Sequence, residues 1–496
     1  MRNAPSCFIR VRRVKYCHEK TRNTDKGEFL MDASNIFAKL FLETKYEDLP
    51  ENVVSEVKKQ ILDYIGVAVA GASKPGALQV RELYEEIGGA EQATVWGSGK
   101  KLPLMFAAQC NATAGHCLDF DDVHEDAVMH PGVVSIPTSF AIADYLGGMT
   151  GRELIVAVAL AGDMICRMGT SLHPGRNVIP YGWHYTTLNG SMVSALLASR
   201  LLGLDFDQAV NAMGLGYHQT AGNGQTVKDG GLAKRLGPGL SVRNGITSAM
   251  LAKKGVTGAK RVMEGEWGFY KVYHGDDYDR EKLLADLGKK WESERVSIKP
   301  YPCCRGIHHF IDCALKLRED YKINPDEIEK IDIECGEGAL GLLCTPLEVK
   351  ANPADIVISQ FSVPWGVACG LALGRATLRE YTDTEYGIHN PEVLKVSGKI
   401  ASVEHTAEMD IGDFERARVT VTMKNGAVYS VTLDHPKGPP DDPLTFDDVV
   451  AKFRGCLQSA DLPIPEENGE KIINIVKDIE NLDDIRELTK LIIWAK

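Results

Sequence analysis

The sequence predicts a mainly α protein in which a large, all-helical domain is interrupted by a smaller α+β domain. Three observations predict this fold. The chain has 496 residues, which is more than one hydrophobic core normally serves. Apolar residues recur at helical spacing in residues 31–288 and again in residues 440–496. Between residues 289 and 439 this spacing gives way to the alternation that is typical of strands.

The first helical part opens with a short predicted helix over Ala33–Phe41. Asn52–Ala70 follows with apolar residues at i, i+3 and i+4, which is the spacing of an amphipathic helix. Arg152–Met168 and Leu188–Leu202 are apolar nearly all round, so we expect them in the interior. Gly245–Lys254 has a similar composition.

The predicted insert contains alternating runs and a turn. Ile328–Cys335 and Ala417–Met423 alternate, and Asn425-Gly426 then leads into Ala427–Leu433. Asn-Gly between two β-branched runs is a strong hairpin signal. Further helices are expected nearby and after the Pro-rich linker at 435–440: Gly306–Leu317, Pro364–Leu373, Thr445–Leu457 and Glu467–Leu491.

The first 30 residues are basic and differ from the rest of the chain. They suggest either a mitochondrial presequence or a disordered or non-native extension. We favour the extension, because Met31 directly precedes a credible helix. The expected location is therefore cytoplasmic, or mitochondrial if the protein is eukaryotic and residues 1–30 are genuine.

Charge and composition exclude several classes of partner. The net charge of -12 repels nucleic acid and anionic membranes, so neither is an expected partner. A small anion remains compatible, because a local group of cations can dominate a closed pocket. The 12 cysteines form no C-x-x-C motif, and we expect mostly buried, reduced thiols. Cys303-Cys304 has no base fixed beside it by the sequence, which disfavours a nucleophilic thiol.

The densest polar cluster spans residues 116–130, with four aspartates, one glutamate and three histidines. Interleaved apolar residues argue against a solvated acidic loop. Three chemical interpretations stay open. The first is a metal site, with ligands from Asp119, Asp121, Asp122, His124 and His130. The second is a magnesium motif of the isoprenoid-synthase type, and the third is metal-free acid–base chemistry.

Three other segments place cationic or histidine side chains where helices are expected to begin. They are residues 182–187 with His184, residues 233–239 with Lys234, and residues 299–306 with Lys299. We expect residues 233–239 to form a Gly-rich turn. Helix N-termini and cations attract anions, so the three segments together favour a pocket for carboxylates over a cation site.

These motifs, with His130-Pro131-Gly132, Lys299-Pro300-Tyr301-Pro302 and residues 361–365, resemble the MmgE/PrpD family over residues 34–460. The family includes 2-methylcitrate dehydratase, cis-aconitate decarboxylase and iminodisuccinate epimerase. The resemblance implies that the α+β domain is a lid over a cleft. It also implies a homodimer, no cofactor or metal, and a small polycarboxylate substrate.

The resemblance assigns roles residue by residue. Asp119 and His130 match the acid–base pair, and His184 matches a pocket histidine of the family. Lys234 and Lys299 match the carboxylate binders, and Asp122 and Trp365 are further expected substrate contacts. The implied reaction is proton removal beside a carboxylate, as in a 2-methylcitrate-type hydro-lyase, with epimerisation or decarboxylation as alternatives.

Several positions depart from the decarboxylase pattern. Val123 stands where those enzymes have threonine, Gly237 where they have histidine, and Trp365 where they have tyrosine. The spacing from Asp119 to His130 is also one residue longer. These differences argue against decarboxylation and leave dehydration and epimerisation open.

Overall fold

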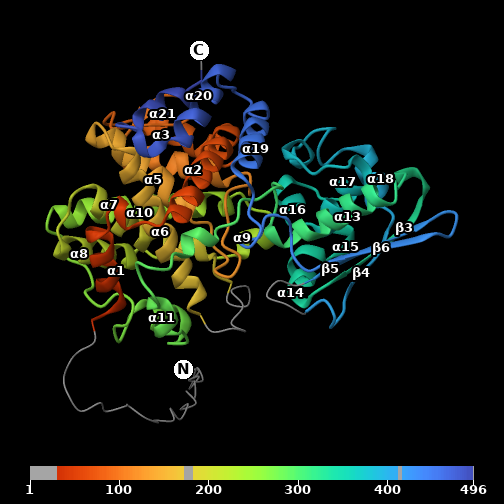
Figure 1. Cartoon of the computed structure of the whole chain (residues 1–496), viewed down its shortest axis with the longest axis horizontal. Coiled ribbons are helices and arrows are strands. Elements are labelled where there is room, and N and C mark those ends of the chain that lie inside the picture. Colours follow the sequence, from red (N-terminus) through yellow and green to blue (C-terminus); the bar gives the residue numbers. More distant parts are fainter. Residues whose placement is uncertain (1–30, 173–181, 411–415, 495–496) are drawn as a thin grey trace, which may run out of the picture. The chain divides into compact units, whose positions relative to one another are not determined.

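A computed structural model describes residues 31–172, 182–410 and 416–494 (Figure 1). The predicted extension, residues 1–30, lies outside this range. The described chain is mainly helical, as predicted. Its first part contains β1 (Ala93–Thr94), β2 (Lys101–Leu102), α1 (Ala33–Glu43), α2 (Glu51–Gly71), α3 (Ala77–Ile87), α4 (Leu104–His116), α5 (Gly132–Leu146), α6 (Gly151–Thr170), α7 (Tyr185–Leu201), α8 (Phe206–His218), α9 (Gln225–Lys228), α10 (Ala233–Lys253), α11 (Phe269–His274) and α12 (Arg280–Leu284).

The nearly all-apolar helices occupy the interior of this first part. α10 packs against α4, α7 and α8, while α2 packs against α4 and α19 (Phe446–Gln458). Side chains of α6 and α7 are buried on almost every face, which is the outcome that their composition predicts. After α19 the chain continues with α20 (Glu466–Lys477) and α21 (Arg486–Leu491).

The later part of the chain contains a four-stranded sheet, in the order β4-β3-β5-β6. The strands β3 (Ile328–Cys335), β5 (Ala417–Met423) and β6 (Val428–Leu433) confirm the predicted strands and hairpin. β4 (Ile400–His405) pairs in parallel with β3, so the chain between them must cross over. The helices of this part are α13 (His308–Asp320), α14 (Glu337–Ala339), α15 (Leu347–Ala351), α16 (Ile356–Gln360), α17 (Val363–Leu373) and α18 (Pro391–Ser397).

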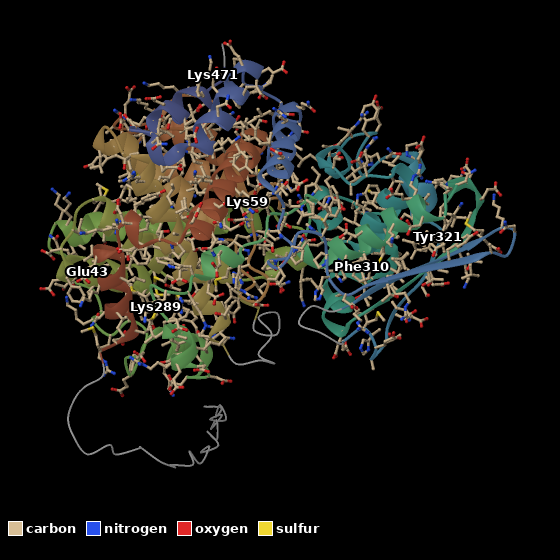
Figure 2. The ribbon with its side chains drawn as sticks, in the orientation of Figure 1. Glu43, Lys59, Lys289, Phe310, Tyr321 and Lys471 are labelled. Atoms are coloured by element: carbon tan, nitrogen blue, oxygen red, sulfur yellow. The ribbon has the colours of Figure 1, made fainter. Side chains whose placement is uncertain are left out.

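Helix α13 packs against β5 and β6, and α17 packs against α13. Phe310, near the start of α13, is fully buried, whereas Tyr321 at its end stacks on Tyr429 of β6 with ring centroids 4.5 Å apart (Figure 2). The sheet therefore has one face covered by helices, as expected of an α+β module.

Buried apolar residues form two clusters. The first draws on residues 33–298 and 444–492 together with Leu378, and the second draws on residues 303–431. By contacts, the chain from Asp32 onward forms a single unit, so the proposed domain boundaries at 288/289 and 439/440 stay predictions. Among the described cysteines no disulfide forms, and all except Cys304 are buried. No helix within the described ranges is both long and apolar enough to cross a membrane.

Two local predictions were wrong. Residues 233–239 do not form a turn but the first two turns of α10. Their glycines serve close helix packing, because a Cβ at Gly237 would lie 2.3 Å from Thr187 Oγ1 and one at Gly239 would lie 2.5 Å from Thr113 Oγ1. The predicted helix Glu467–Leu491 is interrupted between α20 and α21, where a short 3-10 turn replaces it.

Gly115 fixes how closely α4 approaches α2. A Cβ at this position would lie 2.3 Å from the Tyr64 hydroxyl oxygen, which donates to Asn111 O at 3.0 Å. We expect Gly115→Ala to lower the free energy of unfolding by about 1–3 kcal/mol, measured by denaturant titration. Gly455→Ala is the matched control, since no atom lies within 4 Å of a Cβ there, and it should stabilise α19 by about 0.5–1 kcal/mol. Equal effects of the two variants would contradict this account.

Candidate active site

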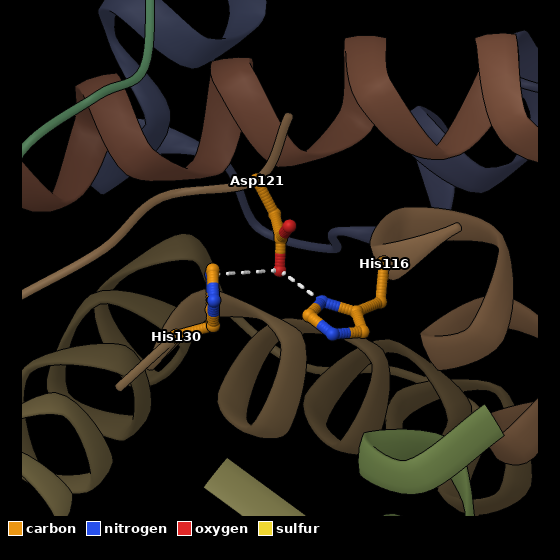
Figure 3. A group of neighbouring side chains, drawn as sticks. All are labelled: His116, Asp121 and His130. Carbon is orange, nitrogen blue, oxygen red and sulfur yellow. Dashed lines mark hydrogen bonds and ion pairs between the residues drawn. The ribbon is translucent and has the colours of Figure 1, made fainter. Parts of the chain in front are cut away.

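Three side chains that the acidic segment carries meet in the interior (Figure 3). His116 ends α4, His130 precedes α5, and Asp121 lies in the connection between these helices. Asp121 Oδ2 lies 2.8 Å from His116 Nδ1 and 3.5 Å from His130 Nδ1. Both His116 and Asp121 are fully buried, so this contact is shielded from water.

Hydrogen bonding defines which ring nitrogens can act as bases. His130 Nδ1 lies 2.7 Å from the carbonyl oxygen of Asp122, which can only accept, so this nitrogen donates. His116 Nδ1 donates in the same way to the Asp121 carboxylate. When these rings are neutral, each Nε2 therefore carries a lone pair. His116 Nε2 is buried and has no hydrogen-bond partner in the described structure.

His184 joins this group from the N-cap of α7. Its Nδ1 lies 2.7 Å from Thr187 Oγ1, one turn further along that helix. The ring centroid of His116 lies 4.9 Å from that of His130 and 5.7 Å from that of His184. The fold thus collects three imidazoles, two from the polar segment 116–130 and one from the start of α7, with His116 near both of the others.

Two lysines and one carboxylate lie beside the imidazoles. Lys234, in the first turn of α10, forms an ion pair with Asp119 Oδ1. Lys299 Nζ donates to the backbone carbonyl of Asp119 at 3.0 Å and lies 3.4 Å from its Oδ2. All three residues are buried, and Asp119 adopts a positive φ of 51° that turns it toward both lysines. Asp119 is therefore held by two cations that the sequence places 115 and 180 residues away.

Burial and charge fix the protonation states. Burial alone would raise the pKa of Asp119, but the ammonium groups of Lys234 and Lys299 hold that pKa well below its ordinary value. Burial would lower the pKa of Lys299, yet Asp119 and Asp121 raise it. The site thus holds the Asp119 carboxylate and the Lys299 ammonium group in their charged forms.

The three imidazoles, in contrast, are held in their uncharged forms. Burial holds the pKa of His116, His130 and His184 well below the ordinary value, and the nearby lysines lower it further. A lowered pKa keeps an imidazole uncharged at neutral pH, so one of its ring nitrogens can accept a proton.

These shifts predict the acid limb of the pH profile. A histidine with its pKa lowered stays unprotonated as the pH falls through the ordinary value of about 6.5. We expect kcat/KM to stay level between pH 7.5 and 6.5 and to fall only at lower pH, because protonation of the base then removes its lone pair. The check is a kcat/KM profile at constant ionic strength, and a half-loss at or above pH 6.5 would contradict the assignment.

Asp122 and Trp365, two predicted substrate contacts, have other neighbours. Both carboxylate oxygens of Asp122 accept from the backbone N–H of Gly132, at 3.0 and 3.1 Å, at the start of α5. Burial and the charge of Asp121 raise the pKa of Asp122 well above its ordinary value. Trp365 has no exposed surface, lies in the second apolar cluster and donates from Nε1 to Glu380 O at 3.3 Å. The structure thus gives Asp122 a helix-capping contact and Trp365 a packing environment.

His116 was not predicted as a site residue, and Asp121 was predicted only as a metal ligand, although both belong to the polar segment that the sequence singles out. The polar segment begins at the end of a helix. The chain therefore turns back there and brings His116 and Asp121, five positions apart, into hydrogen-bonding distance. The sequence could not show that His116 would sit between the other two imidazoles.

The residues that could hold a metal ion differ from the predicted ligand set. His124 instead lies 3.1 Å from Glu292, and Asp122 is used at Gly132. Among the residues that the structure describes, His116, Asp121 and His130 form a group whose candidate ligand atoms all lie within 4.8 Å of one another. Nδ1 of both histidines donates a proton in this arrangement, so a cation at those two nitrogens would have to displace the hydrogen bonds to Asp121 and to the carbonyl of Asp122.

A cavity of about 310 Å³ opens beside Lys234 and His184. None of its lining residues is acidic, so its charged side chains are cations. The lining residues are His184, Thr187, Ser191, Gln219, Ala221, Gly222, Asn223, Thr226, Ala233, Lys234, Gly237, Leu240, Ser241, Arg243 and Asn244. A cavity with this charge suits an anionic small molecule.

The chain is similar in sequence to cis-aconitate decarboxylases from several organisms. Cis-aconitate decarboxylase of Aspergillus terreus is 26% identical over 466 residues, which are 90% of this chain and 93% of the relative. Cis-aconitate decarboxylase of Homo sapiens is 26% identical, with 93% and 95% covered. The enzyme of that name from Mus musculus is 24% identical, with 93% and 94% covered.

Two family profiles match in chain order. The MmgE/PrpD N-terminal domain matches residues 35–281, and the MmgE/PrpD C-terminal domain matches residues 301–481. Together they span most of the chain, including every residue of the histidine and lysine clusters except Lys299, which lies between the two matches. This chain belongs to the MmgE/PrpD family.

Proposed function

We propose that this protein is a metal-independent lyase that removes a proton next to a carboxylate of a small di- or tricarboxylic acid. One observation carries the proposal: neutral imidazoles with unshared Nε2 lone pairs lie beside two buried ammonium groups. The α-proton of a carboxylate is weakly acidic, so its removal requires both a positioned base and fixed positive charge. The cluster provides both.

The proposed reaction begins when substrate carboxylates replace Asp119 as partners of Lys234 and Lys299. The base, for which His130 Nε2 is our first candidate, takes the proton from carbon. The electron pair of the broken C–H bond forms the new C=C bond, and the C–O bond to the leaving hydroxyl breaks. The imidazolium that this step creates on His130 can return the proton to the leaving hydroxyl, which then departs as water.

Dehydration of the 2-methylcitrate type is the first candidate reaction. Of the three residues that depart from the decarboxylase pattern, Gly237 lines the cavity, whereas Val123 and Trp365 are buried and absent from its lining. No side chain fits at Gly237 without displacing Thr187. The cavity lining therefore departs from the decarboxylase pattern at Gly237, a position that a bound substrate could contact. Decarboxylation is the second candidate, favoured by the names of the relatives.

The test is proton NMR of the purified protein in heavy water with citrate, 2-methylcitrate and cis-aconitate, each with and without EDTA. Enzyme-dependent deuterium uptake or new alkene signals that persist with EDTA support the proposal. Alkene signals from 2-methylcitrate indicate dehydration, while loss of carbon dioxide from cis-aconitate indicates decarboxylation. Activity that EDTA abolishes, or no reaction with any of the three acids, would overturn it.

A further inference from the structure

We infer that Arg243, at the other side of the cavity from the catalytic cluster, binds a second, remote carboxylate of the substrate. This inference rests on the proposed function and specifies its substrate class. Lys234 and Arg243 both line the cavity and both belong to α10. They are nine residues apart, which corresponds to about 13 Å along a helix axis.

The guanidinium of Arg243 is oriented by neutral groups. Its Nη1 donates to the Tyr84 hydroxyl at 3.3 Å and its Nη2 donates to Asn244 Oδ1 at 3.3 Å. Tyr84 is itself fixed, because its hydroxyl donates to Gln109 at 2.6 Å and its ring stacks on Phe106. Arginine has five N–H donors, and these two bonds leave the others for a ligand.

No carboxylate of the described residues lies within ion-pairing distance of Arg243. This separates it from Lys234, whose charge is matched by Asp119. Arg243 is half-buried and belongs to a lining without acidic residues, so the described structure offers no carboxylate to match its charge. A planar guanidinium is well suited to a carboxylate, which it can bind through two parallel hydrogen bonds.

The neighbours of Arg243 in the cavity extend the same chemistry. Asn244, Gln219 and Ser241 supply amide and hydroxyl groups to the lining. A volume of about 310 Å³ is at the small end of the range for ligand sites and matches a short-chain acid. The geometry therefore selects acids with carboxylates at both ends over acids with a single carboxylate.

The experiment measures binding, so that it does not depend on turnover. Tricarballylate, which has three carboxylates and no leaving group, and butyrate, which has one carboxylate, are titrated calorimetrically into the wild type, Arg243→Gln and Arg243→Lys. We expect Arg243→Gln to weaken tricarballylate binding about 10- to 100-fold and to leave butyrate binding unchanged, with partial recovery in Arg243→Lys. Arg152→Gln, at an exposed arginine paired with Glu47, is the matched control and should bind like the wild type.

The outcomes separate the two proposals. Wild-type affinity of Arg243→Gln for tricarballylate, or an equal loss for butyrate, would overturn the role of Arg243. Absence of tricarballylate binding to the wild type would overturn it as well. The proposed lyase activity is decided independently by the NMR experiment, because deuterium uptake by the wild type can occur whether or not Arg243 contributes to binding.

Discussion

His130→Gln is expected to lower kcat by about 10²- to 10⁴-fold, the usual contribution of a positioned general base. The glutamine amide can donate to the carbonyl of Asp122 as His130 Nδ1 does at 2.7 Å, but it offers no basic nitrogen. Folding should therefore be nearly unaffected while proton abstraction fails. The measurement is kcat with the substrate identified by NMR, together with the rate of deuterium uptake and the melting temperature.

His124→Gln is the matched control for this variant. His124 is also buried and belongs to the same segment, but its ring interacts with Glu292 and with the backbone N–H of Ala127. We expect kcat within a few-fold of wild type, even if stability falls. An unchanged rate in His130→Gln, or an equal loss in His124→Gln, would show that His130 is not the base.

Asp119→Asn should lower the free energy of unfolding by about 3–5 kcal/mol, because it leaves Lys234 and Lys299 as buried cations without their shared counterion. Turnover should also be lost, since the lysines would no longer be held in place. A polycarboxylate that binds between the lysines restores the missing negative charge. Tricarballylate should therefore raise the melting temperature of Asp119→Asn more than that of the wild type.

Asp163→Asn provides the comparison for this second variant. Asp163 forms a buried ion pair with Arg167 at 2.8 Å, and neither residue lines the cavity. Its loss should also destabilise the fold, but added tricarballylate should shift its melting temperature no more than that of the wild type. Equal shifts in both variants, or normal stability and turnover of Asp119→Asn, would contradict the role assigned to Asp119.

Local patterns predicted much of the fold. The alternation in β3 and the Asn425-Gly426 turn between β5 and β6 are short-range signals, and the structure confirms both. β4 carries no comparable signal, because it is an edge strand in which only Ile400 is buried and the residues do not alternate. Glycines are ambiguous for another reason. Gly237 can mark a turn or a close helix contact, and only the position of Thr187 distinguishes the two.

The candidate site depended on information of a different kind. Composition singled out the polar segment, but only the family resemblance linked Asp119 to Lys234 and Lys299 across long stretches of chain. The structure brings these residues together. It also adds His116 and Asp121, whose importance arises from burial and ring packing that a linear pattern does not contain.

The long sequence separations within the cluster also bear on folding kinetics. The Lys299–Asp119 contact closes a loop of 180 residues, whereas the helices on either side of each residue can form locally. Non-local contacts of this kind are costly to form early, so we expect the charged cluster to assemble after the folding transition state. Substitutions there should then accelerate unfolding while leaving the refolding rate nearly unchanged. The charged cluster would thus slow unfolding and so determine the lifetime of the native protein.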